Sequence, residues 1–313
     1  MKTGFIILII IGILLLLLFI FLLYIYNLIF LMTKRRKMKG LSFDVPFGSD
    51  SDKDIVRNNT KILKEYPHKD VYIKSYDGLT LHGYYYHIND DSPLEIAFHG
   101  YKGQAFRDFS GGALMMIERG FNLLLVEERA HGYSGGHTIT FGVKERYDVL
   151  SWVNFANKNL IKNNKIIILG GISMVAATVV MASSLELENV RGIIADCPYS
   201  SPKEIILNTV KNMKLNEKLA YPFIYLSALL FGRFRLNKSS AVKEIENSKY
   251  KVLLIHGMSD SFVPFKMSEE IASKSSLVEF HAFSGADHGL SYIVDSNRYI
   301  KIVNDFLDNV LTN

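Results

Sequence analysis

The sequence predicts one large α/β domain, built on a mostly parallel, doubly wound sheet and preceded by a single apolar helix. Short apolar runs alternate with helical stretches from Leu94 onward, which is typical of parallel strands covered by helices on both faces. Before them lies an antiparallel pair, 70–75 and 79–86, joined by the turn Tyr76-Asp77-Gly78. The predicted later strands cover 94–98, 121–126, 165–169, 190–195, 251–255 and 278–283.

The apolar helix is predicted from residues 5–32, which hold no charged residue. These 28 residues exceed the roughly 20 that cross a bilayer. A secretory signal peptide is the alternative, but its apolar core would be about 7–15 residues long and would precede a small-residue cleavage site. Neither condition holds, so we predict an uncleaved membrane anchor over residues 1–33.

The charges around this helix predict its orientation. Five basic residues follow the span, four of them in the cluster 34–37, against Lys2 and the α-amino group before it. The positive-inside rule then places the rest of the chain in the cytoplasm, as a single-pass protein of the cell membrane. The opposite orientation, with an extracytoplasmic domain, stays open because the rule is statistical. We expect residues 34–68 to be a basic juxtamembrane segment and tether, and residues 69–313 to form the α/β domain.

Outside the N-terminal region the charges balance. The formal net charge is +5, but the first 39 residues hold six basic residues and no acid, which leaves 30 basic against 31 acidic residues. A balanced surface gives no basis for a nucleic-acid partner. The single cysteine, Cys197, excludes an internal disulfide and a zinc cluster of cysteines.

The rhythm of strands and helices is interrupted at about residues 201–249. Within this insertion, residues 221–231 are more apolar than a solvated helix should be. We predict a helical cap whose apolar face covers the active site. A plain buried helix and a surface that touches the membrane are the alternatives.

The candidate nucleophile is Ser173, between a buried strand and an alanine-rich helix. A serine at such a sharp turn forms a nucleophile elbow, which exposes its Oγ above the sheet edge. The usual pattern is G-x-S-x-G, and Gly171-Ile172-Ser173-Met174-Val175 departs from it at the last position. An ordinary turn with an N-capping serine is the alternative interpretation.

A serine nucleophile needs a base and an acid that orients the base. His288 follows the last predicted strand, where the sheet edge would bring it over Ser173. Asp260 lies in the loop after the preceding strand, and Asp196 is the competing acid. The chain order Ser173, Asp260, His288 is that of nucleophile, acid and base in α/β-hydrolases, and it favours Asp260.

Two further histidines, His99 and His256, end strands at the same edge, and we assign them to loop shaping. An oxyanion needs two hydrogen-bond donors. One is the backbone N–H of Met174, directly after the serine. The other should come from the loop 99–103, and we predict the backbone N–H of Tyr101, because glycines on both sides allow this amide to turn inward.

Seven segments of the chain have the order and spacing of a known family: 99–101, 129–136, 140–148, 171–174, 196–199, 255–264 and 286–288. Together they resemble bacterial α/β-hydrolases of the serine aminopeptidase-like (S33, YqkD-like) group. The resemblance covers about Asp70 to the C-terminus and implies an α/β-hydrolase fold without a metal or organic cofactor. It also implies a Ser173–Asp260–His288 triad and an oxyanion hole from Tyr101 and Met174.

The function predicted from the sequence is that of a membrane-anchored serine hydrolase with carboxylesterase-like chemistry. Its partner would be a small-molecule acyl substrate, with a lipophilic one favoured by the anchor and the apolar insertion. A peptidase or a thioesterase of the same fold is the alternative enzyme. Because Val175 replaces the elbow glycine, a catalytically impaired pseudoenzyme that acts as a binding module is the alternative from another class.

Overall fold

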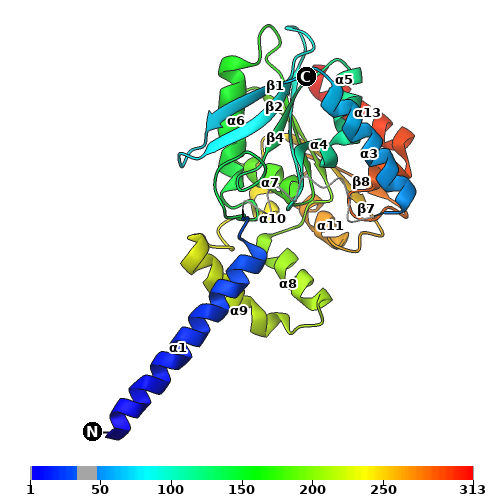
Figure 1. Ribbon diagram of the computed structural model, residues 1–313. Coiled ribbons are helices and arrows are strands. Elements are labelled where there is room, and N and C mark those ends of the chain that lie inside the picture. Colours follow the sequence, from blue (N-terminus) through cyan, green and yellow to red (C-terminus); the bar gives the residue numbers. More distant parts are fainter. Residues whose placement is uncertain (1, 34–47, 313) are drawn as a thin grey trace.

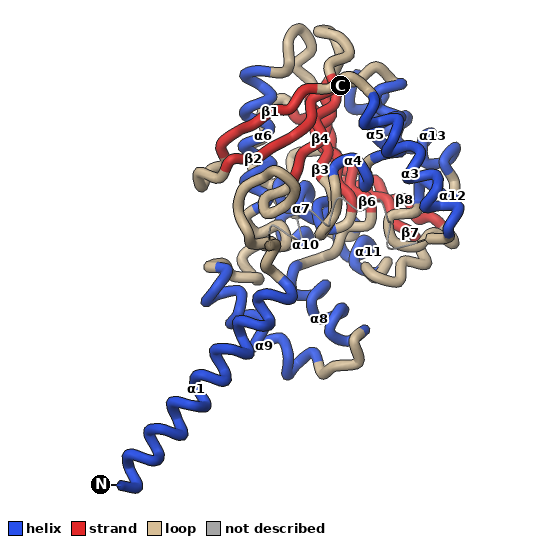
Figure 2. The backbone as a smooth tube through the Cα atoms, viewed as in Figure 1, coloured by secondary structure: helices blue, strands red, loops and turns tan. Residues whose placement is uncertain are grey.

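The computed structural model describes residues 2–33 and 48–312, so the basic cluster at 34–37 lies outside the described residues. One eight-stranded sheet, in the order β1-β2-β4-β3-β5-β6-β7-β8, forms the centre of the molecule (Figures 1 and 2). The strands are β1 (Lys69–Lys74), β2 (Thr80–Tyr86), β3 (Leu94–Phe98), β4 (Asn122–Glu127), β5 (Ile167–Ile172), β6 (Val190–Asp196), β7 (Lys251–Gly257) and β8 (Val278–Phe283).

The strand directions agree with the predicted architecture. β1 pairs with β2, and β2 with β4, in antiparallel register. The other neighbours in the sheet, from β4 and β3 through to β8, all pair in parallel. β3 and β4 are buried along their whole length because helices cover both faces of the sheet, which explains why they contain few polar residues. The prediction of a mostly parallel, doubly wound sheet is confirmed.

Helices pack on the two faces of the sheet (Figure 1). On one face lie α6 (Glu145–Asn159), α7 (Met174–Ala182), α10 (Ala241–Ile245) and α11 (Lys266–Ala272). On the other lie α3 (Asp50–Glu65), α4 (Ala105–Asp108), α5 (Ser110–Glu118), α12 (Ser291–Val294) and α13 (Ser296–Thr312). α3 falls within the predicted tether and packs against α4 and α5, so this part of the tether is an ordered piece of the domain.

The segment 201–249 leaves the layered domain as a small helical subdomain, and this agrees with the predicted helical insertion. It contains α8 (Pro202–Asn212), α9 (Glu217–Ser227) and the short π-helix η1 (Ala228–Gly232), before α10 returns to pack on α7. α8 and α9 lie below the domain and beside the N-terminal helix in Figure 1. We call α8, α9 and η1 the cap.

The N-terminal helix α1 (Lys2–Ile29) projects from the domain, and its segment Thr3–Ile29 is long and apolar enough to cross a membrane. Its first turns are exposed, whereas its C-terminal half packs against α9 and η1. The rings of Phe19 and Phe231 lie 5.3 Å apart, and those of Phe21 and Phe223 lie 5.6 Å apart. The apolar run of the insertion therefore packs against the N-terminal helix.

The chain that follows α1 is bound to the domain through its backbone. Leu31 forms an isolated antiparallel bridge with Thr138. The N–H of Met32 donates to the carbonyl of His137 at 2.7 Å, and the N–H of Ile139 donates to the carbonyl of Phe30 at 2.8 Å. Phe30 is fully buried. The chain at the end of α1 is thus fixed against the domain by these backbone hydrogen bonds.

Candidate active site

Ser173 occupies a strained turn between β5 and α7. Its φ is 58° and its ψ is −121°, a backbone conformation that a residue with a side chain adopts only when the surrounding structure enforces it. The close packing of β5 and α7 is part of that enforcement, because a Cβ atom on Gly171 would lie 2.8 Å from the carbonyl oxygen of Val175. The Ser173 side chain makes no N-cap hydrogen bond to α7, so the N-capping interpretation is wrong.

Val175, which replaces the second elbow glycine, is accommodated without disturbing this turn. Its side chain is fully buried in the apolar core formed with α7. The close approach to Gly171 involves the backbone of Val175 and of Ala176, not the valine side chain. The elbow therefore keeps its geometry with a β-branched residue at this position.

Three predicted site residues meet above the sheet edge. The Oγ of Ser173 lies 2.7 Å from Nε2 of His288, and Nδ1 of His288 lies 2.7 Å from Oδ2 of Asp260. An ionised carboxylate only accepts hydrogen bonds, so Nδ1 carries the proton and Nε2 accepts from the serine hydroxyl. This arrangement has the connectivity of a nucleophile, a base and an orienting acid.

The carboxylate of Asp260 is held in its ionised form. Burial alone would raise the pKa of Asp260. The hydrogen bonds from His256 and His288 outweigh this effect and hold the pKa well below its usual value. The other oxygen, Oδ1, accepts the backbone N–H groups of Phe262 at 2.9 Å and Val263 at 2.7 Å. These contacts fix the orientation of the carboxylate that faces His288.

His256 was assigned above to loop shaping, but it contacts the acid directly. Its Nε2 lies 3.0 Å from Oδ2 of Asp260 and 3.0 Å from the carbonyl of Val263. Both of these neighbours accept hydrogen bonds, so Nε2 carries the proton and donates to Asp260. The Nδ1 of His256 lies 2.6 Å from the hydroxyl of Ser268. Sequence reasoning missed this role, although the spacing of four residues across a strand end was a usable signal.

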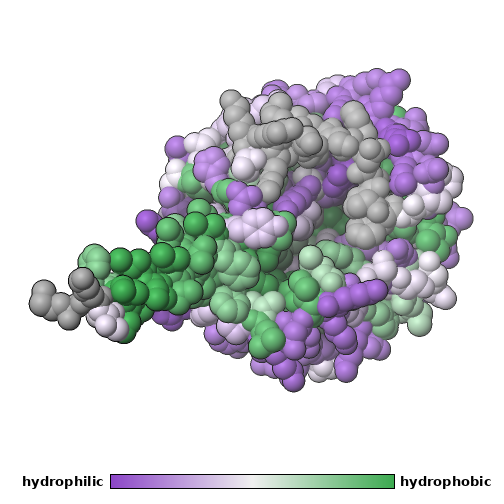
Figure 3. All heavy atoms as spheres, turned by 60° about the horizontal axis from the view of Figure 1, so that its bottom comes forward, coloured by the Kyte–Doolittle hydropathy of each residue, from purple (hydrophilic) through white to green (hydrophobic). Residues whose placement is uncertain are grey.

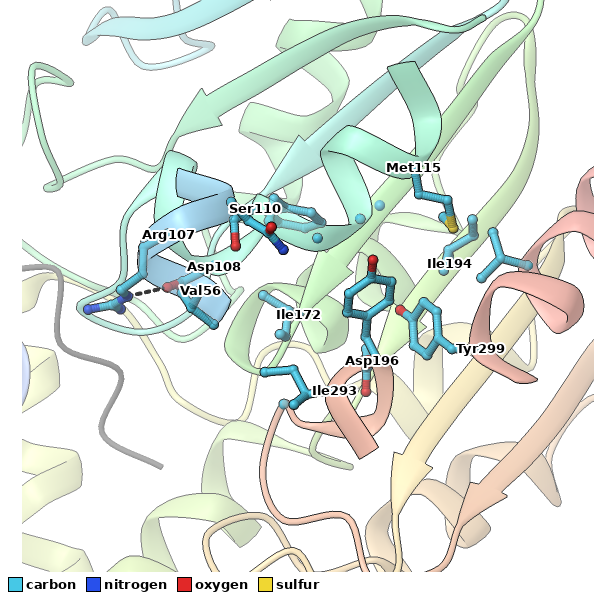
Figure 4. A pocket seen from close by; sticks show the side chains of 18 of the residues that line it. Val56, Arg107, Asp108, Ser110, Met115, Ile172, Ile194, Asp196, Ile293 and Tyr299 are labelled. Carbon is cyan, nitrogen blue, oxygen red and sulfur yellow. Dashed lines mark hydrogen bonds and ion pairs between the residues drawn. The ribbon is translucent and has the colours of Figure 1, made fainter. Parts of the chain in front are cut away.

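The competing acid, Asp196, lies elsewhere. Its side chain is buried in an inner pocket behind the elbow, near Tyr299 (Figure 4). Its Oδ1 has no hydrogen-bond partner among the described residues, and burial raises the pKa of Asp196 to about 7. Glu95 lines the same pocket, where burial raises its pKa to about 8. Of the two candidate acids, Asp260 is the one that reaches His288.

The loop after β3, which is predicted to supply a second oxyanion donor, lies beside Ser173. A Cβ atom on Gly100 would lie 3.3 Å from the Cβ of Ser173. The next residue, Tyr101, lines both pockets that meet at Ser173. Met174 begins α7, so its N–H is among the first four of a helix, which have no acceptor within the helix.

Two pockets meet at Ser173. The first, of about 240 Å³, is apolar and runs between the domain, α8 and the end of α1. The second, of about 110 Å³, is lined by His288 and by the ion pair of Arg107 and Asp108, whose Nε and Oδ1 atoms lie 2.7 Å apart. Figure 4 shows this ion pair at one end of the adjoining inner pocket and Asp196 deeper inside it. The apolar pocket is lined by Leu28, Ile29, Tyr101, Phe141, Ser173, Met174, Tyr199, Ile205, Ile206, Thr209, Val210, Met213 and Phe262.

Cys197 lies close to two of these residues, and its Sγ and the nearest ligand atoms of Asp260 and His288 are within 4.8 Å of one another. A metal would need the thiolate. Burial raises the pKa of the Cys197 thiol well above its usual value, which disfavours the thiolate. The atoms of Asp260 and His288 that would bind a metal are hydrogen-bonded to each other. The three residues fit a hydrogen-bonded site better than a metal centre.

The fold and the comparisons with known proteins define the class of this protein, which is an α/β-hydrolase of the esterase and peptidase type. The chain belongs to the X-Pro dipeptidyl-peptidase (S15) family, whose model matches residues 49–218. That range contains Ser173 and ends before Asp260 and His288. The expected membership of the α/β-hydrolase superfamily is confirmed.

Individual relatives agree with this class. The uncharacterized protein YqkD of Bacillus subtilis is 26% identical over 241 residues, which are 76% of this chain and 78% of that protein. The Pyrococcus furiosus esterase Pf2001 superposes with a TM-score of 0.64 at 26% identity, covering 80% of this chain and 93% of that one. Est1E from Butyrivibrio proteoclasticus, solved with ferulic acid bound, has a TM-score of 0.61 at 19% identity, covering 78% and 100%, and shares the fold.

Proposed function

We propose that this chain is a membrane-anchored serine hydrolase that cleaves a carboxylic ester or a related acyl bond. The observation that carries the proposal is the chain of contacts from Ser173 through His288 to Asp260, with 2.7 Å at each step, on a strained elbow. Strained backbone conformations cluster at active sites. The esterase named among the structural neighbours favours the same chemistry.

The proposed reaction has two steps. Oγ of Ser173 attacks the acyl carbonyl carbon while Nε2 of His288 takes the hydroxyl proton; His288 then returns this proton to the leaving alcohol as the ester C–O bond breaks. Water next attacks the acyl-enzyme, again giving a proton to His288, and the carboxylic acid leaves as Oγ of Ser173 regains its proton. Asp260 stabilises the imidazolium that forms in each step. The backbone N–H groups of Met174 and Tyr101 would bind the oxyanion.

A peptidase is the second candidate, favoured by the family match. A carboxylate is the strongest hydrogen-bonding partner for the ammonium group of a peptide N-terminus. Among the described residues lining the two pockets at Ser173, the one acid is Asp108, which already binds Arg107 and accepts the N–H of Gly100 at 3.0 Å. This occupied carboxylate and the apolar neighbouring pocket favour an uncharged acyl group, as an ester or a thioester.

The anchor is the second part of the proposal. α1 would cross the cell membrane once and leave the catalytic domain in the cytoplasm, as the basic residues after the span favour. Protease added to intact cells should leave the domain uncut, and protease added after permeabilisation should digest it. Digestion in intact cells would reverse the proposed orientation.

A fluorophosphonate probe tests the hydrolase directly, because it labels an activated serine without requiring the natural substrate. Wild-type protein should be labelled, and Ser173→Ala should not. Ser173→Ala and His288→Ala should each lower turnover of p-nitrophenyl acetate by a factor on the order of 10³ or more, without unfolding. A folded wild type that is inert to the probe and to the ester would instead support the pseudoenzyme.

A further inference from the structure

The apolar pocket beside Ser173 is bounded in part by the anchor helix. Leu28 and Ile29, in the last turn of α1, line it from one side, and Val210 and Met213, at the end of α8, line it from another. Ser173 lies among the same lining residues. A segment long enough to cross a bilayer therefore ends in the wall of the catalytic pocket.

This wall is held in place by hydrogen bonds. The last carbonyls of a helix have no partner within the helix. Here the hydroxyl of Tyr101 donates to the carbonyl of Ile29 at 2.8 Å, and the ammonium of Lys102 donates to the carbonyl of Leu28 at 3.3 Å. Both donors belong to the loop that adjoins Ser173, so the end of α1 and the reacting atoms form one connected unit.

The depth of the pocket relative to a bilayer follows from the length of α1. The 27 residues Thr3–Ile29 extend about 40 Å at 1.5 Å per residue, against a hydrocarbon core of about 30 Å. The last turns, which contact the cap, therefore reach the membrane surface. Figure 3 shows that the hydrophobic surface of α1 continues onto the adjoining face of the molecule.

The cap has the surface of an element that lies on a membrane. Leu219 and Leu230 are 69% and 51% exposed, and Met213 and Leu215 are exposed as well. Large exposed apolar side chains that adjoin a membrane span indicate contact with the bilayer. The segment 201–249 also holds nine basic residues and four acidic ones, a charge that anionic lipid headgroups attract.

We propose that the apolar pocket takes the acyl chain of an ester-bearing membrane lipid, which reaches Ser173 from the bilayer along the last turn of α1. The inference rests on the proposed hydrolase function and names its substrate class. The acyl carbonyl would lie at Ser173, with the alcohol part of the lipid in the second pocket beside Arg107. Water and the ester would give a fatty acid, which returns to the bilayer, and the alcohol.

A binding experiment tests this inference independently of hydrolysis. Full-length Ser173→Ala protein is reconstituted in phosphatidylcholine and phosphatidylglycerol vesicles that contain a phosphatidylcholine with a diazirine on its acyl chain. After illumination, mass spectrometry should locate adducts on Ile206 or Val210, which line the pocket and are buried. Adducts confined to α1 and to exposed side chains such as Met213, which any surrounding lipid would label, would overturn the inference.

A kinetic experiment uses two exposed residues in the turn between α8 and α9. Met213 lines the pocket and Leu215 does not, and both side chains are more than half exposed, so a glutamate at either position replaces no packed core side chain. In full-length protein in vesicles, Met213→Glu should lower kcat/KM for p-nitrophenyl palmitate at least tenfold more than for p-nitrophenyl acetate, because a charge then lies in the path of the chain. Leu215→Glu should change this ratio less than twofold.

The outcomes separate the two proposals. Equal effects of Met213→Glu on both esters, without adducts on α8, would overturn the membrane-lipid inference and leave the hydrolase intact. A wild type that hydrolyses neither ester would overturn the proposed hydrolase, and adducts on α8 would then identify the pocket as a lipid-binding site.

Discussion

The hydroxyl of Tyr101 donates a hydrogen bond of 2.8 Å to the carbonyl of Ile29, the last residue of α1. The two residues are 72 positions apart in the chain, and the bond joins the apolar N-terminal helix to the loop beside Ser173. The end of this helix and the candidate site therefore share a wall, and this relationship leads to the first prediction.

Tyr101→Phe should lower kcat for p-nitrophenyl acetate about 2- to 10-fold in the full-length protein. The reason is that a net hydrogen bond of about 0.5–1.5 kcal/mol between the loop and α1 is lost, while the ring keeps its packing on Phe141. Tyr133→Phe, at a tyrosine that is 64% exposed, is the matched control. Equal effects of the two substitutions would show that the bond to Ile29 does not position the loop.

His256 is predicted to be a positioning residue for the acid. His256→Phe should lower kcat about 10- to 100-fold, because a hydrogen bond to a charged group contributes about 1.5–3 kcal/mol. KM for a short ester should stay the same, since His256 lines neither pocket at Ser173. His256→Gln supplies an N–H donor for Asp260 and should recover part of kcat. If both variants lose activity equally, the residue acts through packing alone.

Val175→Gly should destabilise the protein without improving catalysis. The substitution removes a fully buried side chain and adds backbone freedom in a helix, for a combined cost of about 2–4 kcal/mol in the free energy of unfolding. The elbow is already formed with valine, so kcat should change less than about twofold once folded protein is compared. Urea unfolding in detergent measures the first effect. A clear rise in kcat would mean that the valine strains the working site.

The buried acid Glu95 predicts a pH dependence of stability. Burial raises its folded pKa to about 8, from an unfolded value of about 4.3. Between these values the folded state binds more protons than the unfolded state, so the free energy of unfolding falls as the pH rises from about 5 to 8. Glu95→Gln removes this titration and should raise the unfolding temperature at pH 8 by at least about 3 °C relative to wild type, but less at pH 5.

The control for this prediction is Glu118→Gln, at an exposed position on α5. It should leave the difference between the unfolding temperatures at pH 5 and pH 8 unchanged. If Glu95→Gln keeps the wild-type difference between the two pH values, the loss of stability comes from another buried acid, such as Asp196, and not from Glu95.

Local pattern determined much of this protein. The alternation of short apolar runs with helical stretches specifies parallel strands between helices, and the antiparallel pair before them follows from its Asp-Gly turn. The apolar length of residues 5–32 specifies a span-length helix in the same direct way. Asp260 and His288 each follow a predicted strand, and loops at the carboxyl edge of a parallel sheet lie close together above it. Their positions in the sequence were therefore enough to predict them as site residues.

Only the tertiary structure decided which side chains touch. Asp196 ends β6 and Asp260 follows β7, and the direction of each side chain, set by packing, places one in an inner pocket and the other beside His288. The contact of His256 with the acid was decided in the same way. The wall that Ile29 contributes to the pocket depends on contacts across 72 residues, which no local periodicity encodes. Residue type and spacing specify the elements, whereas long-range packing specifies the site.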